Sequence, residues 1–504
     1  MLLNLDPSNV VRARALPDWV EPSDAGLSVI GDDSLGRETY VAESGGEALV
    51  ATSLPEMVDA LRTRNSIRIS PQGISHVLGM GFTPLPTTIF DGVFRVGAGD
   101  VATVDPSGVS VENSYPWVLS KSRQDEVPST ARLLELMVRS LERELAKSDR
   151  DGVLMMSAGK DSVGLAIAIA ELGYDIPCVT YRADPGNAEP EYAAEFCRNL
   201  GLRHQTVEMP KDPGVLRGYL STFFERAVAP SADHAIIPFV VTVGESGVRS
   251  GGIIDGGGND GYMGYFASRR RQKKRVFRIR GRWLQEAAAQ LTPIDSRINY
   301  LARTRSAAAW SGRNMRYHEI LPIYEDAIDP ADQWRAQDRH LAGMSDADRA
   351  VVNMVRQIEG ARTPDKVRLV AQVQGMRPIL PYCDPELADY SFNLPLSSRF
   401  DRKKRIGKIL LTQLLEEKLG YDPDAVESGF FEFDGGPFFA ANAEYVKEEI
   451  YDCDLWTPAV RPLVDGWLDA IADRPFLFHP LLSLFVISGW HNHSPALRNP
   501  REDG

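Results

Sequence analysis

The stretch VLMMSAGKDS, residues 153–162, decides the fold of this chain. Its apolar run ends in a turn of small residues, and a second apolar run of helical length, residues 163–172, follows. We therefore predict a strand, a tight loop and a buried helix. Backbone N–H groups of such a loop converge on one point, and the positive end of the following helix is aimed at the same point. The segment thus predicts a binding site for a phosphate anion.

Asp161 sits inside this predicted loop and would repel a bare phosphate, so its presence indicates a bridging Mg²⁺. The segment differs from the common phosphate loop, which requires G-x-x-x-x-G-K-[ST]. We interpret it as a nucleotide-phosphate loop with a built-in metal ligand. A Gly-Lys turn between a core strand and a helix, with no ligand, is the alternative that this segment alone leaves open.

Bulk properties narrow the class of protein. A chain of 504 residues is too long for one ordinary core, so we expect at least two domains. No apolar run is long enough to span a bilayer, and no basic region followed by an apolar stretch marks a secretory signal. The scattered cysteines (Cys178, Cys197, Cys383, Cys453) argue against a disulfide framework or a zinc site and fit a reducing cytoplasm. A net charge of −13 argues against general nucleic-acid binding.

Hydrophobic patterns divide the chain into two parts. Up to about residue 115 short β-like runs alternate with Gly, Pro and Asp, which predicts a small β-rich domain. These runs are residues 27–30, 39–42, 48–51, 93–96 and 109–111. A helix is predicted over 128–147, so we place the boundary near 115–127 and the domains at 1–118 and 119–504.

Strand and helix patterns alternate beyond that boundary, which predicts a doubly wound parallel sheet of α/β class. The predicted elements are a strand at 152–156, a helix at 162–172, a strand at 178–181, a helix at 189–200 and a strand at 204–208. Ligands bind such sheets at the carboxyl ends of the strands, where the Ser157 loop would lie. From about residue 283 onward the pattern is mostly helical.

The order Ser-x-Gly-Lys-Asp-Ser resembles the pyrophosphatase loop, S-G-G-x-D-S, of enzymes that cleave ATP to AMP and pyrophosphate. Further segments occur in the order that the asparagine synthetase family shows, and the resemblance covers about residues 115–420. They are NAEPEYA with LGLRH (187–193, 200–204), PSAD with Pro238 (230–233), IIDGGGNDGYMGY (253–265), and LPYCD with LP and KIL (380–384, 394–395, 408–410). The third of these is similar to the family's G-E-G-x-D-E-x-F-G-G-Y.

This resemblance implies an ATP- and Mg²⁺-dependent ligase that adenylates a carboxylate and joins it to a nitrogen nucleophile, forming an amide or lactam. It also implies the residues that bind nucleotide, with Asp161 and Asp260 as the metal ligands. These are Ser157, Ala158, Gly159, Lys160, Asp161, Ser162, Tyr181, Gly256, Gly257, Gly258 and Asp260.

Two positions depart from the family pattern for acyl transfer. Gly257 stands where asparagine synthetases carry Glu and β-lactam synthetases carry Tyr, and Asp255 is the nearest replacement for the missing base. The family's late Lys, in R-P-K-x-G, has no counterpart in residues 425–430. Lys403, Lys404 and Lys408 lie upstream and could substitute for it, so we assign Asp255, Lys404 and Lys408 as the candidate catalytic residues.

The N-terminal part of the sequence also departs from the family pattern. GRETY (36–40) through ATSL (51–54) resembles the middle of the family's glutaminase domain, which needs an N-terminal Cys. Residue 2 is Leu and the first Cys is Cys178, so we expect an inactive, truncated glutaminase-like domain and no hydrolysis of glutamine. The same organisation occurs in β-lactam synthetases and lasso-peptide cyclases.

Several alternatives stay open at this point. A lasso-type peptide macrocyclase shares every motif, so the carboxylate and amine partners are either small molecules or peptides. An RNA-modifying enzyme with a pyrophosphatase loop and a non-catalytic nucleotide-binding scaffold are the others. The basic run RRRQKKR, residues 269–275, is a solvated helix face, a rim that attracts ATP or an acidic substrate, or a nucleic-acid contact with Trp283 stacking. We expect no membrane and no nucleic-acid partner, and homodimerisation is left open.

Overall fold

The structure is a computed structural model of the chain. It describes residues 2–5, 16–23, 26–105, 108–113, 123–183, 186–261, 263, 284, 287–288, 291, 314–344, 349, 352–401, 406–426, 433, 435–495 and 497.

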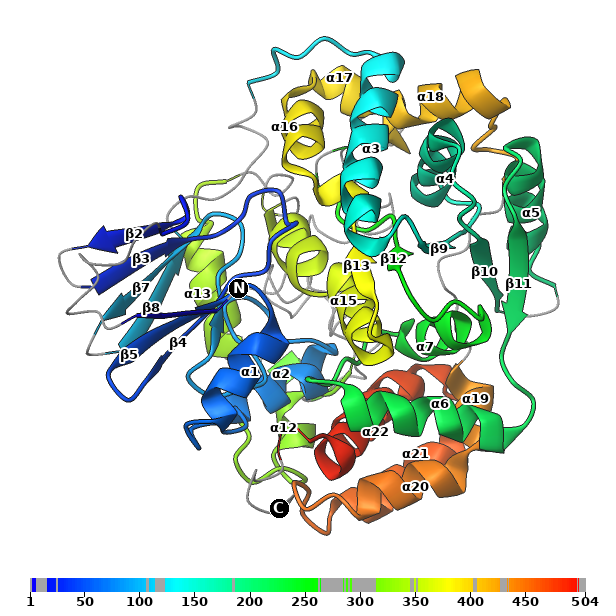
Figure 1. Cartoon of the computed structure of the whole chain (residues 1–504). Helices are drawn as coiled ribbons and strands as arrows, with labels where there is room; N and C mark the ends of the chain where they lie inside the picture. Colours follow the sequence, from blue (N-terminus) through cyan, green and yellow to red (C-terminus); the bar gives the residue numbers. More distant parts are fainter. Residues whose placement is uncertain are drawn as a thin grey trace.

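The N-terminal part is a sandwich of two antiparallel sheets (Figure 1). One sheet has the order β1-β5-β4-β6, and the other has the order β2-β3-β7-β8. Their bounds are β1 Leu2–Leu5, β2 Val20–Ser23, β3 Gly26–Ile30, β4 Tyr40–Ser44, β5 Glu47–Ala51, β6 Phe94–Arg95, β7 Asp100–Asp105 and β8 Gly108–Asn113. Buried side chains from both sheets, such as Val29, Val41, Val50 and Val104, form the core between them. The predicted β-rich domain is confirmed.

Two helices, α1 (Leu54–Arg62) and α2 (Pro71–Met80), cover the other face of the first sheet. Each begins after a serine whose hydroxyl accepts a backbone N–H of the first turn, with a proline among the first helical residues. Their apolar faces belong to the same large core as the C-terminal helices, which joins the N-terminal part to the rest of the chain.

A five-stranded parallel sheet of order β11-β10-β9-β12-β13 forms the centre of the second part. Its strands are β9 Gly152–Met155, β10 Cys178–Arg182, β11 His204–Glu208, β12 Gly252–Ile254 and β13 Arg377–Ile379. Along β9 the side chains alternate between two cores: Val153 and Met155 enter one, and Leu154 enters the other. Helices therefore cover both faces, as the predicted doubly wound α/β fold requires.

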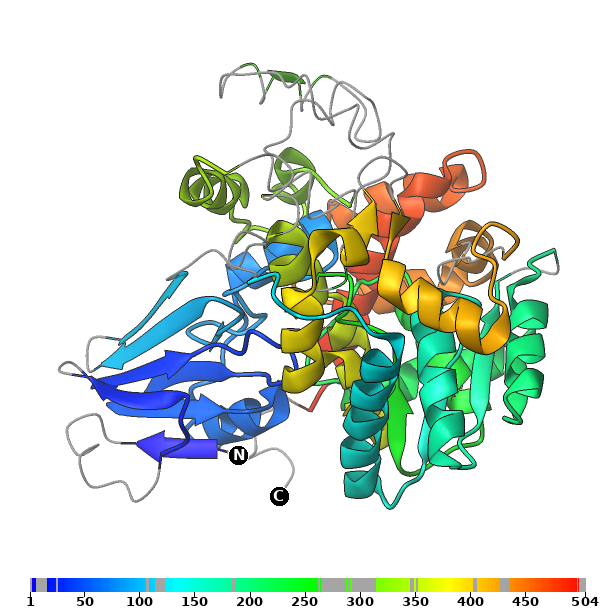
Figure 2. The same cartoon turned by 90° about the horizontal axis from the view of Figure 1, so that it is seen from above.

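One face carries α3, α4, α16 and α18, and the other carries α6, α7 and α15 (Figures 1 and 2). Helices α20, α21 and α22 pack beneath the second layer, where α22 contacts both α6 and α2. The bounds are α3 Thr130–Leu145, α4 Lys160–Leu172, α5 Glu189–Asn199, α6 Pro213–Arg226, α7 Ile236–Glu245, α12 Tyr317–Ile320, α13 Ala331–His340, α15 Thr363–Gln374, α16 Pro385–Asn393, α17 Leu396–Arg399, α18 Ile409–Leu419, α19 Gly435–Ala441, α20 Ala443–Tyr451, α21 Val460–Ala470 and α22 Phe478–His493.

Short elements complete the chain. A π-helical segment spans Met354–Glu359, a short hairpin pairs β14 (Phe400–Asp401) with β15 (Ile406–Gly407), and 3₁₀ turns occupy Ala146–Ser148, Pro381–Cys383 and Pro475–Leu477. The four cysteines are buried and unbridged. None of the helices within the described ranges combines the length and apolar character that crossing a bilayer demands.

Most predicted elements of the second part lie within two residues of their observed bounds. The start of α4 is a correction, because the helix begins at Lys160 and not at residue 162. Gly159 is its N-cap with extended backbone, so Lys160, Asp161 and Ser162 belong to the first helical turn and not to the loop. The predicted division between residues 118 and 119 lies outside the described residues, and of the predicted boundary range 115–127 only residues 123–127 are described.

Candidate nucleotide site

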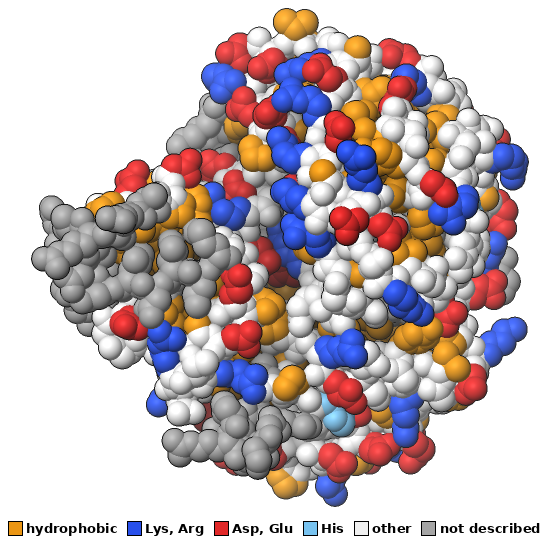
Figure 3. Space-filling model, in the orientation of Figure 1, with side chains coloured by type: hydrophobic (Ala, Val, Ile, Leu, Met, Phe, Trp, Pro, Cys, Tyr) orange, Lys and Arg blue, Asp and Glu red, His pale blue; other side chains and the backbone are white. Residues whose placement is uncertain are grey.

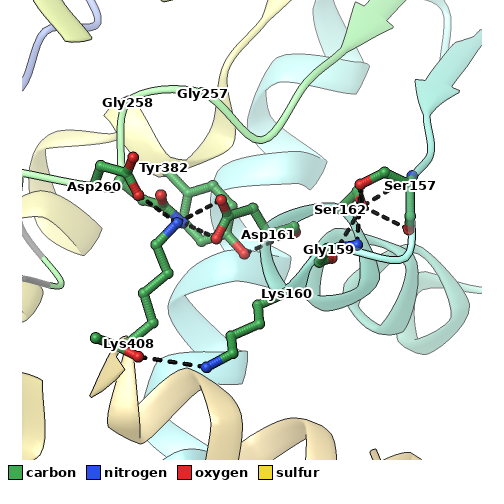
Figure 4. Close-up of polar contacts among 12 residues, drawn as sticks. Ser157, Gly159, Lys160, Asp161, Ser162, Gly257, Gly258, Asp260, Tyr382 and Lys408 are labelled. Carbon is green, nitrogen blue, oxygen red and sulfur yellow. Dashed lines mark hydrogen bonds and ion pairs between the residues drawn. The ribbon is translucent and has the colours of Figure 1, made fainter. Parts of the chain in front are cut away.

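The phosphate loop joins β9 to α4 and is held by its own serines (Figure 4). The hydroxyl of Ser162 lies 2.8 Å from that of Ser157 and accepts the backbone N–H of Ser157 at 3.0 Å. Gly159 donates its N–H to the Ser157 hydroxyl at 3.1 Å. No side chain caps the start of α4, so the N–H groups of its first turn and its positive dipole end stay available to an anion.

Contacts from neighbouring elements fix the same loop from outside. The backbone N–H of Ala158 donates to Glu189 Oε1 at 3.3 Å, and the Tyr421 hydroxyl donates to the Ala158 carbonyl at 3.1 Å. Tyr181, predicted to contact the nucleotide, lies in β10 beside the loop strand and is 6% exposed. Burial raises the pKa of its hydroxyl to about 12, so it stays a neutral donor.

A second loop follows β12, the neighbour of β9 in the sheet, and carries residues 255–260. Close approaches require glycine at two of its positions. A Cβ on Gly256 would lie 2.7 Å from the Asp161 Cβ, and one on Gly258, whose φ is +97°, would lie 2.2 Å from Cys383 Sγ. The second loop is thus pressed against the first turn of α4 and against Cys383, and Asp260 lies next to Asp161.

Lys408 stands between these two carboxylates. Its Nζ lies 2.5 Å from Asp161 Oδ2 and 2.5 Å from Asp260 Oδ1 (Figure 4). Burial alone would lower the pKa of the Lys408 ammonium, but Asp161 and Asp260 raise it above its ordinary value. Asn259 completes the cluster by donating from Nδ2 to Asp161 Oδ1 at 2.7 Å. The structure therefore brings together both predicted metal ligands and one of the candidate catalytic lysines.

The backbone at Lys408 explains how the side chain reaches this place. The residue adopts left-handed backbone, with φ of 60°, immediately before α18, and its N–H donates to the Met263 carbonyl at 3.1 Å. Left-handed backbone is costly for a residue with a side chain and is retained mainly at functional positions. Lys160 points toward the same segment, with Nζ 3.5 Å from the Gly407 carbonyl.

The carboxylate pair fits a magnesium ion by the nature of its donors. Both groups already face one positive charge, and Mg²⁺ takes one or two protein carboxylates together with phosphate oxygens and water. Within the described part of the chain, no group of three or more His, Cys, Asp or Glu side chains forms a complete metal cage.

Glu359, which the sequence analysis missed, contacts the same glycine loop. It lies at the end of the π-helical segment, is 4% exposed and accepts the Gly258 N–H at 2.8 Å through Oε2. Burial, with a further contribution from Asp260, raises the pKa of its carboxyl to about 8. Residues 354–359 carry no motif, and only the π-helix, a form often found at functional sites, points to this position.

Glu359 makes folding stability depend on pH. Its pKa rises from 4.5 to about 8 on folding. The contribution of protonated Glu359 to the free energy of unfolding is therefore fully present below pH 4.5, and it is lost as the pH rises through about 8. Glu359→Gln cannot ionise, so we expect its free energy of unfolding to rise relative to that of the wild type as the pH increases from 4.5 to about 8. Each unit of pKa shift corresponds to about 1.4 kcal/mol.

Urea unfolding at pH 5 and pH 8.5, without nucleotide or metal, measures this difference. Glu195→Gln, at an exposed position of α5, is the matched control. Parallel pH dependence of the wild type and Glu359→Gln would contradict the assignment.

The other predicted residues fall into two groups. Asp255 is the first residue after β12, and its Oδ1 accepts the Gly257 N–H at 2.8 Å. This hydrogen bond shapes the turn. The role of Asp255 as a base stays a prediction. Lys403, Lys404, the basic run 269–275 and most of the stretch 425–430 lie outside the described residues.

The comparison with family models agrees with this geometry. The asparagine synthase model matches residues 132–426, which include both loops, Glu359 and Lys408, and the chain belongs to that family. The family comprises ATP-dependent ligases that form amides. No curated protein matches the chain at a significant level.

Proposed function

We propose that this protein is an AMP- and pyrophosphate-forming ligase. It adenylates a carboxylate and joins it to a nitrogen nucleophile without hydrolysing glutamine. The observation that carries the proposal is a cluster beside an uncapped helix N-terminus. Lys408, at the start of α18, pairs there with Asp161 and Asp260, which follow the neighbouring strands β9 and β12.

The residues of this site support both phosphate binding and the departure of pyrophosphate in the adenylation step. The first turn of α4 binds phosphate oxygens through backbone N–H groups, and Asp161 and Asp260 would hold Mg²⁺. The metal, when bound, withdraws charge from the phosphates and makes pyrophosphate a better leaving group. Lys160 and Lys408 bring positive charge to the same place. The substrate carboxylate then attacks the α-phosphorus, and pyrophosphate departs with the electron pair of the broken P–O bond.

The second step needs a nitrogen with a free electron pair. The nitrogen attacks the acyl carbon, AMP leaves with the electrons of the C–O bond, and the nitrogen passes one proton to a base. Gly257 supplies no side chain for this transfer, whereas the Asp255 carboxylate lies on the same loop.

The N-terminal part supports a glutamine-independent reaction. It has no cysteine, because the first cysteine of the chain is Cys178. Its helices α1 and α2 instead supply Met57, Leu61, Ile74 and Leu78 to the core that contains α22. We propose that this part is retained for packing.

The products formed when the enzyme cleaves ATP test the proposal. With a pool of amino acids, dicarboxylic acids and small amines, we expect AMP and pyrophosphate to form in equal amounts. Separation of nucleotides by chromatography, without added pyrophosphatase, measures them. ADP and orthophosphate as the first products would refute the proposal.

Replacing Asp255 tests the second step separately. We expect Asp255→Ala to slow amide formation about 10²–10⁴-fold, the usual contribution of a general base, and to slow ATP–pyrophosphate exchange far less. Asp255→Asn keeps an oxygen that can accept the Gly257 N–H, so it separates proton transfer from support of the turn. Equal loss of both rates in Asp255→Ala, with full activity in Asp255→Asn, would make Asp255 a residue of the fold.

A further inference from the structure

A cavity of about 220 Å³ lies between the N-terminal part and α15. Figure 3 shows the molecular surface hollowed between these two parts. The walls are mostly apolar and come from both sides, including Leu54, Phe82 and Ile89 on one side and Ala361, Leu369 and Met376 on the other. The cavity is therefore a product of the packing of the two parts.

One wall of the cavity carries a network of charges. Arg95 Nη1 lies 2.8 and 2.7 Å from the two oxygens of Asp365, and Arg368 Nη1 lies 3.2 Å from Asp365 Oδ1. Glu38 lies within 3.7 Å of both arginines and accepts the Tyr40 hydroxyl at 2.6 Å. Two arginines and two carboxylates thus balance one another.

The members of this network differ in what they present to the cavity. The Asp365 side chain is 34% exposed, whereas those of Arg95 and Arg368 are 9% exposed and that of Glu38 is 16% exposed. A third arginine of the wall, Arg362, is paired with Asp233 at 2.9 Å. The charged group most open to a ligand in this wall is therefore a carboxylate, which favours a cation.

The cavity and the nucleotide site share the start of α15. A Cβ on Gly257 would lie 3.5 Å from Thr363 Cγ2, and Ala361 and Arg362, which precede Thr363, line the cavity. Further along the helix, Asp365, Arg368, Leu369 and Gln372 continue the same wall. The first turn of α15 thus borders both the cavity and the Gly257 loop.

We propose that this cavity binds the nitrogen substrate, a small primary amine with an apolar body whose ammonium group pairs with Asp365. This assignment as a substrate site rests on the proposed ligase function. Asp365 is paired with Arg95 and Arg368, but 34% of its side chain stays exposed to receive an ammonium group, whereas the arginines are 9% exposed. An acid of the same size would meet this exposed carboxylate. A neutral alcohol would fill the apolar volume without a charge-assisted hydrogen bond.

Binding of isopentylamine to the nucleotide-free protein tests the site directly. Isothermal titration calorimetry with isopentylamine, 3-methylbutan-1-ol and isovalerate compares ligands of equal shape and different charge. We expect the amine to bind at least about tenfold more tightly than the alcohol, and isovalerate to bind most weakly.

Two variants locate the site. Asp365→Asn should weaken amine binding about tenfold or more, while Asp91→Asn, an exposed carboxylate of the N-terminal part, should not change it. Because Asp365→Asn also removes a partner of Arg95, Ala229→Phe provides a second variant. It fills the cavity from the lining segment 228–231, leaves Asp365 intact and should abolish binding. Equal affinity for amine and alcohol, or unchanged affinity in both variants, would overturn the proposal.

The substrate role has its own test. With the acid that supports ATP–pyrophosphate exchange, isopentylamine should lower the exchange rate without competing with the acid or with ATP, because an amine in its own site consumes the adenylate. Inhibition that excess acid or excess ATP relieves would place the amine in the acid or nucleotide site and overturn the assignment. Absence of exchange with every acid, while binding still follows Asp365, would refute the ligase function and leave the amine site standing.

Discussion

Replacing either Asp161 or Asp260 by Asn is expected to lower ATP–pyrophosphate exchange by at least about a thousandfold. Each change removes one of two carboxylates that face a single positive charge. A metal that stabilises transition-state charge contributes several kcal/mol, and each 1.4 kcal/mol is a factor of ten in rate. The remaining carboxylate also stays paired with Lys408, which weakens it further as a metal ligand.

A control separates loss of the metal from loss of the fold. Asp175→Asn removes an exposed carboxylate that pairs with Arg203, and we expect exchange to stay near the wild-type rate. Thermal unfolding with and without Mg²⁺ and ATP gives a second measurement, since a ligand that binds the native state stabilises it. Near wild-type exchange in a folded Asp161→Asn protein would show that the two-carboxylate site is wrong.

The sequence predicted those parts of the site that local patterns encode. The run Val153–Met156 and the small residues after it define a buried strand and a tight turn, so the position of Ser157 at a strand end follows directly. The helix start was missed by two residues because Gly159, at the end of the loop, serves as the N-cap. Parallel pairing of β9 with β12 then places the Asp260 loop beside the first one.

Other features depend on contacts between distant segments. Lys408 follows Asp161 by 247 residues, and only the tertiary fold shows that its ammonium enters the carboxylate pair. Glu359 ends a π-helical segment that carries no motif, and it contacts Gly258, which lies 101 residues earlier in the chain. Helices α1 and α2 were missed because Pro55 and Pro71 resemble helix breakers, although proline is well accommodated in a first turn.

The position of Lys408 leads to the other large expected effect. Lys408→Met would leave two facing carboxylates, with the buried Glu359 nearby, without their shared cation. Removing one member of a buried ion pair costs about 3–5 kcal/mol, and partial exposure of the two aspartates reduces this to about 2–4 kcal/mol. Urea unfolding at pH 7 without metal measures the loss.

Adding Mg²⁺ should restore part of that stability, because a cation can again occupy the space between the carboxylates. Two variants provide controls at matched positions. Lys408→Arg keeps the positive charge and the left-handed backbone. Lys160→Met removes a neighbouring lysine whose Nζ contacts the Gly407 carbonyl and whose pKa is lowered by burial and by Lys408. We expect both controls to lose less stability than Lys408→Met, and neither to gain as much from Mg²⁺. If Lys408→Met and Lys160→Met lost equal stability and responded equally to Mg²⁺, Lys408 would be one basic residue among several and not the cation around which the carboxylate pair is built.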